Sequence, residues 1–108
     1  MKKLLPENPD AIFAASDVMA IGAMRAVLEA GLKIPEDIAF VGFDDFPIAT
    51  LSDIRLTTVR QPVIQFGAKA VELLIDIIEN GTNPPRHILM ETELVIRESC
   101  GSQIKGKQ

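Results

Sequence analysis

Short apolar runs and longer amphipathic stretches alternate along the chain, which has 108 residues. The runs at 11–15 and 38–43 have the length and apolar composition of buried strands. The stretch between them, 17–30, carries apolar residues at helical spacing, and the Ser16 and Asp17 side chains can cap a helix there. This strand–helix–strand order over about 30 residues predicts a βαβ unit.

The second half of the chain continues the alternation. Residues 46–52 are expected to form a loop or a short helical turn, and 56–61 a more amphipathic strand. A helix is predicted at 62–79, followed by one long strand at 87–98 and a loose polar tail at 102–108. Continuous apolar strands joined by helices predict an α/β fold with a parallel sheet flanked by helices.

Polar residues follow two of the predicted strands. Ser16 and Asp17 come after the first strand, and Asp44 and Asp45 come after the second. Ligands of parallel sheets bind beyond the carboxyl ends of the strands, so both pairs are candidates for ligand contact. The same residues are also explained as a helix N-cap and a solvated loop, and the pattern alone leaves the two interpretations open.

Both predicted helices carry more apolar surface than one contact with a sheet requires. In the helix at 17–30, one apolar sector is suited to packing on the sheet: Met19, Ala23, Ala26, Val27 and Ala30. An adjoining sector widens the apolar arc: Ala20, Ile21, Met24 and Leu28. The helix at 62–79 leaves only five polar side chains for water. We therefore expect a further protein surface against both helices.

Composition and charge narrow the function classes. Eleven Lys and Arg stand against 15 Asp and Glu, and no basic cluster offers a surface for nucleic acid. Cys100 is the only cysteine, so no internal disulfide can form and a reducing, cytoplasmic setting is expected. His87 is the only histidine and lacks companions at catalytic or metal-ligand spacing. No apolar run reaches membrane-spanning length. We expect no catalysis, metal, cofactor or membrane contact.

A series of short motifs carries a resemblance to a known family. The motifs read AIFAASD (11–17), MAIGAM (19–24), GLKIPEDI (31–38), VGFDD (41–45), LTTVRQP (56–62) and LVIRES (94–99). In this order and spacing they resemble the C-terminal half of LacI/GalR-family transcriptional regulators, over nearly the whole chain. Periplasmic sugar-binding proteins share weaker forms of several of these motifs. The TTVRQP block and the lack of a secretion signal favour the regulators.

The resemblance implies part of a periplasmic-binding-protein-like (type I) fold, in which two lobes joined by three crossovers enclose a ligand cleft. Residues 1–57 and 94–101 would belong to the C-terminal subdomain. Residues 58–93 would supply a crossover and elements of the N-terminal subdomain. A small polar effector, expected to be a carbohydrate, would bind between the lobes of the complete protein.

Matching positions imply a role for several residues. The family's aspartate at the position of Asp44 binds sugar hydroxyls or another polar effector group, so Asp44 would be the ligand acceptor. Ser16 would face the cleft, where many family members carry asparagine instead, and Gln61 would lie near the hinge and the pocket. Asp45 would brace the loop.

The resemblance also implies a homodimer. Its interface would include Ala20, Ile21, Met24, Phe46, Ile48 and Leu51. The family binds DNA through an N-terminal helix-turn-helix, which this sequence lacks, so we expect a fragment of a regulator that does not bind DNA itself. Two alternatives stay open: a fragment of a secreted sugar-binding protein, and an unrelated small α/β enzyme.

Overall fold

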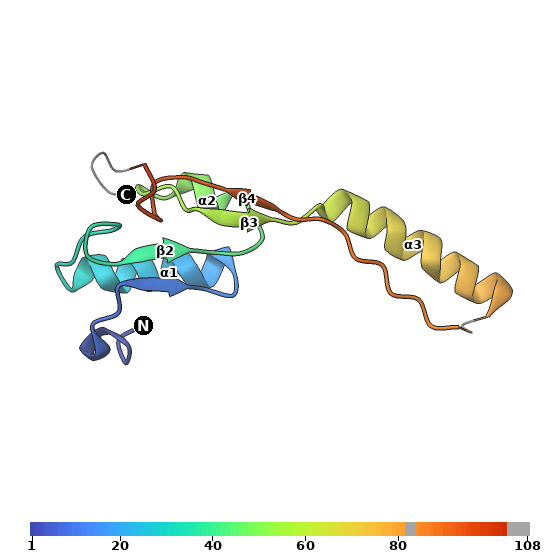
Figure 1. Ribbon diagram of the computed structural model, residues 1–108, viewed down its shortest axis with the longest axis horizontal. Coiled ribbons are helices and arrows are strands. Elements are labelled where there is room, and N and C mark those ends of the chain that lie inside the picture. Colours follow the sequence, from blue (N-terminus) through green and yellow to red (C-terminus); the bar gives the residue numbers. More distant parts are fainter. Residues whose placement is uncertain (82–83, 104–108) are drawn as a thin grey trace. The chain divides into compact units, whose positions relative to one another are not determined.

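The computed structural model describes residues 1–81 and 84–103, which fall into two compact units (Figure 1). The first unit comprises Met1–Arg60 and Glu93–Gln108, and the second comprises Gln61–Thr92. The elements of the first unit are the 3-10 helix η1 (Leu5–Glu7), β1 (Ala11–Phe13), α1 (Asp17–Glu29), β2 (Ala39–Val41), α2 (Ile48–Leu51), β3 (Thr58–Arg60) and β4 (Glu93–Val95). The second unit contains α3 (Val63–Asn80).

Strands β1 and β2 form a parallel pair, with Phe13 opposite Val41 in the register. The helix α1 connects them, which confirms the predicted βαβ unit. On the other side of β2, a parallel bridge joins Val41 to Thr57, and the Gly42 N–H donates to the Thr57 carbonyl at 2.9 Å. The chain just before β3 therefore extends the parallel arrangement beyond β2.

The buried face of α1 consists of Asp17, Ala20, Met24 and Val27, at spacings of three and four residues. The expected sheet-facing sector is correct for Val27, which is fully buried, and wrong for Met19, which is 60% exposed. The Asp17 carboxylate is hydrogen-bonded inside the unit, and this contact in the first turn sets the rotation of the whole helix. A polar residue thus decides which apolar side chains enter the core.

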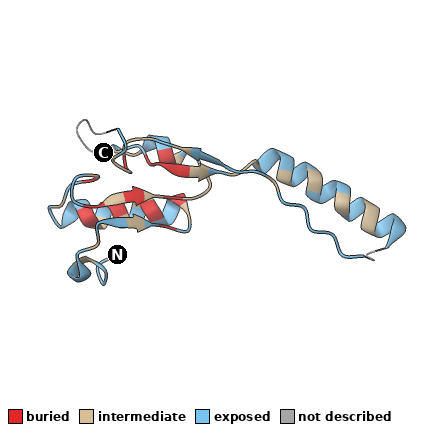
Figure 2. Ribbon diagram, in the orientation of Figure 1, coloured by how far each residue is buried: buried red, intermediate tan, exposed pale blue. Residues whose placement is uncertain are grey.

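The apolar core lies within the first unit, between α1, β2 and the segment that leads into β3 (Figure 2). Phe40 from β2, Val27 from α1 and Leu56 are fully buried in it. The predicted strand at 11–15 is shorter than expected and is not buried throughout, since Phe13 is 66% exposed. The exposed side chain leaves one face of β1 open to solvent in this chain.

The predicted long strand at 87–98 is wrong in its extent. Only Glu93–Val95 forms a strand, β4, and it pairs antiparallel to β3. A strand needs a partner for its backbone groups, and among the described residues none pairs with 87–92. After β4 the chain returns to the core, where Ser99 exchanges hydrogen bonds with Phe40. The sheet structure is therefore mixed, within the predicted α/β class.

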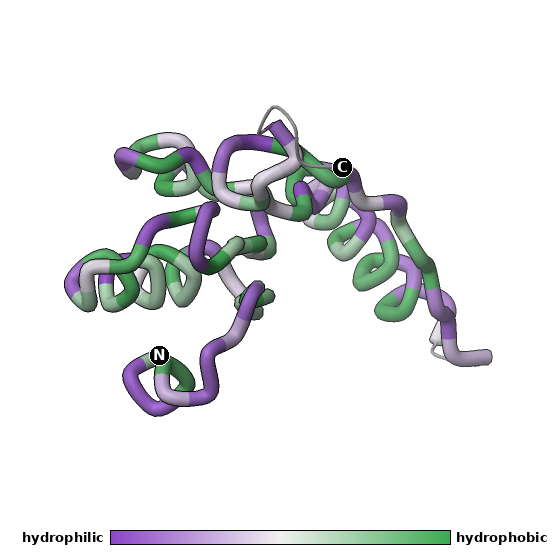
Figure 3. The backbone as a smooth tube through the Cα atoms, turned by 60° about the vertical axis from the view of Figure 1, so that its left-hand side comes forward, coloured by the Kyte–Doolittle hydropathy of each residue, from purple (hydrophilic) through white to green (hydrophobic). Residues whose placement is uncertain are grey.

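The second unit is dominated by α3, whose 18 residues include none that is buried. Figure 3 shows hydrophobic positions recurring along this helix. Ile64 is 82% exposed and Ile78 is 74% exposed, although a solvated helix normally keeps such side chains inward. Asp76 forms an ion pair with Arg86 from the returning chain of the same unit. The prediction of excess apolar surface on this helix is confirmed.

Candidate functional site

The carboxyl ends of β1 and β2 lie side by side. The register that pairs Phe13 with Val41 continues past both strands, where the Asp17 N–H donates to the Phe43 carbonyl at 3.0 Å. Ser16 and Asp44, which follow these strand ends, therefore occupy the same edge of the sheet. The edge is the place where parallel sheets bind ligands.

Ser16 caps the N-terminus of α1. Its backbone is extended, and its hydroxyl oxygen accepts a hydrogen bond from the Met19 N–H at 3.2 Å. The capping interpretation of Ser16 is thus confirmed. The side chain is half-buried, and its contact with a ligand stays a prediction.

Asp44 and Asp45 adopt an uncommon backbone conformation, with φ angles of 121° and 63°. Positive φ disfavours most residues other than glycine, although Asp and Asn tolerate it better than others. The Asp44 N–H donates to the Val59 carbonyl at 2.9 Å, so the turn is joined to β3. Each such residue costs on the order of 1–3 kcal/mol of backbone strain, which surrounding contacts must offset.

Asp45 supplies two of these contacts. Its Oδ2 accepts from Arg60 Nε at 2.7 Å, and its Oδ1 accepts from an Arg97 guanidinium nitrogen at 2.7 Å. Burial raises the pKa of Asp45, but the hydrogen bonds and charges of the two arginines outweigh it and hold the pKa below its usual value. The predicted bracing role of Asp45 is confirmed by these ion pairs.

The structural role of Asp17 was missed from the sequence, which offered it only as a possible helix cap or a ligand contact at the sheet edge. It is fully buried, and its two carboxylate oxygens accept from the Thr58 hydroxyl at 2.6 Å and from the Phe46 N–H at 2.8 Å. The carboxylate therefore joins the start of α1 to β3 and to the segment after Asp45. One signal was available: two cap-forming residues stand in succession, and a helix uses only one.

Gly42 leaves room for the Asp17 carboxylate, which lies close to its Cα atom. A Cβ atom at Gly42 would lie 2.5 Å from Asp17 Oδ1 and 2.8 Å from a Leu56 methyl carbon. The lack of a side chain at the end of β2 is thus required for the close approach of α1.

Gln61 belongs to the second unit, where its carbonyl accepts from the Val63 N–H at 2.9 Å at the start of α3. It directly follows β3, whose last residue is Arg60. Its contact with a ligand stays a prediction.

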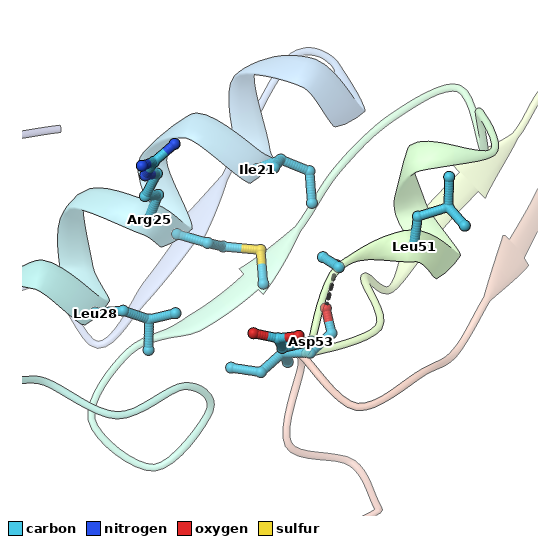
Figure 4. A pocket seen from close by; sticks show the side chains of 8 residues that line it. Ile21, Arg25, Leu28, Leu51 and Asp53 are labelled. Carbon is cyan, nitrogen blue, oxygen red and sulfur yellow. Dashed lines mark hydrogen bonds between the residues drawn. The ribbon is translucent and has the colours of Figure 1, made fainter.

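A groove of about 330 Å³ lies between α1 and α2 (Figure 4). Ile21 and Leu28 line it from α1, and Leu51 lines it from α2. Beyond Leu51, the Ser52 hydroxyl donates to the Ile54 carbonyl at 2.6 Å, which closes the chain around this side of the groove. The groove lies among the residues predicted for the dimer interface.

Those interface residues differ in how much surface they present. Ala20 is fully buried in its own chain and Met24 is 3% exposed, so neither has much surface left for a partner. Ile21 and Ile48 are half-buried, Phe46 is 45% exposed and Leu51 is 78% exposed. The interface prediction accordingly centres on the last four residues.

Other kinds of site find no support in the described part of the chain. Residues 1–81 and 84–103 contain no group of three or more His, Cys, Asp or Glu side chains able to hold a metal ion. No described helix is long and apolar enough to cross a membrane. The arrangement at the sheet edge offers hydrogen-bonding groups on a braced scaffold, which suits binding of a polar molecule.

Comparison with known proteins agrees with this arrangement. The family model described as a periplasmic binding protein-like domain matches residues 1–100. The HTH-type transcriptional repressor MelR of Bacillus subtilis is 42% identical over 97% of this chain. The chain spans about a third of that relative's length, 31%.

Two solved structures of regulators are also similar. The CelR–cellobiose complex matches with a TM-score of 0.84 and 39% identity, over 91% of this chain and 31% of that one. The lac repressor dimer, bound to operator and the anti-inducer ONPF, matches with a TM-score of 0.81 and 33% identity, over 91% and 35%. The chain therefore belongs to the periplasmic binding protein-like family, in its branch of LacI-family transcriptional regulators.

Proposed function

We propose that this chain is the C-terminal part of the effector-sensing and dimerisation domain of a sugar-responsive transcriptional regulator. In the intact protein, Asp44 accepts hydrogen bonds from effector hydroxyls, and Ser16 and Gln61 line the same cleft. The effector is a neutral carbohydrate, and DNA is bound through a separate helix-turn-helix. No catalytic step is involved.

The observation that carries the proposal is the geometry at the edge of the sheet. Asp44 follows β2 in a strained backbone conformation that a neighbouring double ion pair holds in place. Strain of this kind persists where surrounding structure enforces it, and it is common at binding sites. A carboxylate there can accept two sugar hydroxyls at once, which neutral acceptors do less strongly.

The relatives support the regulator over a secreted sugar-binding protein and over an enzyme. MelR and CelR are described as transcriptional regulators, and CelR was solved with cellobiose bound. The match to the periplasmic binding protein-like family model covers residues 1–100, a range that includes the strand ends on which the proposal rests.

A thermal-shift panel on the intact regulator tests the effector class. Cellobiose, maltose, sucrose and glucose are compared with nucleosides and amino acids at matched concentrations. A ligand that binds the folded state raises the Tm by mass action, so at least one sugar is expected to raise it while the other classes do not. A shift produced only by a nucleoside or an amino acid would overturn the carbohydrate assignment.

A further inference from the structure

The ion pairs of Asp45 bear on the ligand-binding role proposed above for its neighbour Asp44. Asp45 is 10% exposed at its side chain, and its carboxylate is shared between Arg60, the last residue of β3, and Arg97, which follows β4. These two strands carry the chain out of the first unit and back into it. One carboxylate thus binds both connecting segments.

Arg97 is held in place independently of Asp45. Its guanidinium donates to the Leu56 carbonyl at 3.0 Å, and its backbone N–H donates to the Thr57 hydroxyl at 2.8 Å. Arg97 is 14% exposed at its side chain, so water screens this pair less than it screens the ion pairs at the surface. Arg97 is therefore a fixed anchor, and Asp45 is the group attached to it.

The other anchor is more exposed. Arg60 contacts Asp45 through Nε and also approaches Glu93 of β4 at 3.5 Å. Its side chain is 50% exposed, which makes it the weaker of the two partners. Arg97 is accordingly the partner whose removal should have the larger effect.

From these contacts we infer that Asp45 is a positioning residue for effector binding. By binding Arg97 and Arg60 it fixes the backbone of the turn at 44–45, and with it the direction in which the Asp44 carboxylate is presented. The inference rests on the proposed role of Asp44. It adds that Arg97, a residue with no assigned ligand contact, controls effector affinity through Asp45.

The first test needs no effector. Amide hydrogen exchange is measured by NMR on the 108-residue chain and on its Asp45→Asn and Arg97→Gln variants. The N–H groups of Asp44 and Phe46, which donate to Val59 and Asp17, are expected to exchange about tenfold faster in both variants. Amides in the middle of α1 should be unchanged.

The matched control is Arg55→Gln. Arg55 forms a 2.8 Å ion pair with Glu98, so this variant also removes one arginine from one ion pair of the same unit without removing a partner of Asp45. It should leave exchange at Asp44 and Phe46 unaltered. Unchanged exchange in Arg97→Gln, or an equal increase in Arg55→Gln, would overturn the inference.

The second test measures effector affinity in the intact regulator by calorimetry, using the sugar identified by the thermal-shift panel. Asp45→Asn and Arg97→Gln are each expected to weaken binding about three- to tenfold, and the double variant by less than the product of the two. Arg97→Lys should retain more affinity than Arg97→Gln, because it keeps the charge.

The two proposals fail in different ways. If Asp44→Asn weakens binding while Asp45→Asn and Arg97→Gln do not, the positioning role is wrong and the ligand role of Asp44 stands. If Asp44→Asn binds as well as the wild type, the ligand role itself is wrong. The amide-exchange measurement then shows whether the ion pairs hold the turn at all.

Discussion

Two carboxylates hold the turn that carries Asp44, and they do so by different physical means. Asp17 is fully buried and accepts two hydrogen bonds, from Thr58 and Phe46. Asp45 lies nearer the surface and acts by ion pairing. Removing Asp17 would leave two hydrogen-bond donors without this acceptor, whereas the ion pairs of Asp45 act through charge.

Replacing Asp17 with alanine is expected to lower the free energy of unfolding by about 2 kcal/mol or more. The substitution leaves the Thr58 hydroxyl and the Phe46 N–H without this acceptor, and a buried unsatisfied group costs about 1–3 kcal/mol. Urea denaturation measures the change. Glu36→Ala is the control, because it also removes one carboxylate but from an exposed position. Its free energy of unfolding should stay within about 0.5 kcal/mol of the wild-type value. If the Asp17→Ala and Glu36→Ala variants lost the same unfolding free energy, the hydrogen bonds of Asp17 would not stabilise the fold.

Protonation of Asp45 should remove its ion pairs. Because the folded-state pKa lies below the ordinary value of 3.8, the pairs contribute stability above that value and lose it as the pH falls through the folded pKa. The wild type should therefore be more stable than Asp45→Asn at about pH 7, and the difference should shrink toward about pH 2. The measurement is the unfolding free energy of the wild type and of Asp45→Asn at both pH values. A pH-independent difference would show that the pairs contribute nothing through charge.

At the scale of elements, two glycines differ in the space around them. Gly42 directly follows β2 and lies against the Asp17 carboxylate and a Leu56 methyl group. Gly22 lies within α1, and nothing lies within 4 Å of the position of a Cβ added there. The same substitution should therefore have opposite effects at these positions.

Gly42→Ala is expected to destabilise the chain by about 1–3 kcal/mol, because the added methyl group overlaps its neighbours. Gly22→Ala is expected to stabilise it by about 0.5–1 kcal/mol, because alanine is the better residue in a helix. Thermal unfolding of the two variants and the wild type shows whether each substitution lowers or raises the stability. Destabilisation by both, or by neither, would mean that the packing of α1 against β2 is described wrongly.

The sequence predicted the order of these elements better than their contacts. The strand at 38–43, the helix from Asp17 and the cap at Ser16 follow from local patterns of apolar and capping residues. The rotation of α1 does not, because it depends on hydrogen bonds between Asp17 and residues about 30 and 40 positions away. A sequence window cannot contain such a contact. The extent of β4 was overestimated for a related reason, since strand pairing depends on a partner elsewhere in the chain.

At the candidate site, too, the sequence predicted the residues better than the contacts between them. The resemblance indicated Asp44, Ser16 and Gln61, and the polar ending of two parallel strands indicated their edge of the sheet. Nothing local indicated that Arg97 would reach Asp45 across 52 positions. The available signal was that Arg97 directly follows the apolar segment 94–96, because an arginine drawn toward a core needs a partner for its charge.

At the scale of the whole molecule, the exposed apolar surfaces imply assembly. Leu51 lines the groove between α1 and α2, Phe46 is 45% exposed in the same unit, and α3 presents Ile64 and Ile78 to solvent. We expect the chain to form a homodimer or a larger assembly at micromolar concentration, with the groove side of the first unit in the interface.

Leu51→Glu tests that location. Leu51 is 78% exposed, so the substitution should leave the fold intact while placing a charge in the proposed interface. Sedimentation should show a shift toward monomer. The control is Leu89→Glu, at a residue that is 99% exposed in the second unit, which should leave the distribution unchanged. A wild-type chain that sediments as a compact, stable monomer would contradict the expectation of assembly.

Calorimetric titration of the intact regulator and its Asp44→Asn variant shows whether Asp44 binds the effector. Asparagine keeps the shape of the side chain but removes the charge, so the variant should still fold and dimerise. Losing a charged hydrogen bond costs about 1.5–3 kcal/mol, so the effector affinity should fall roughly tenfold to a hundredfold if Asp44 binds the effector. An unchanged affinity would contradict this role and make Asp44 a solvated residue at the end of a strand.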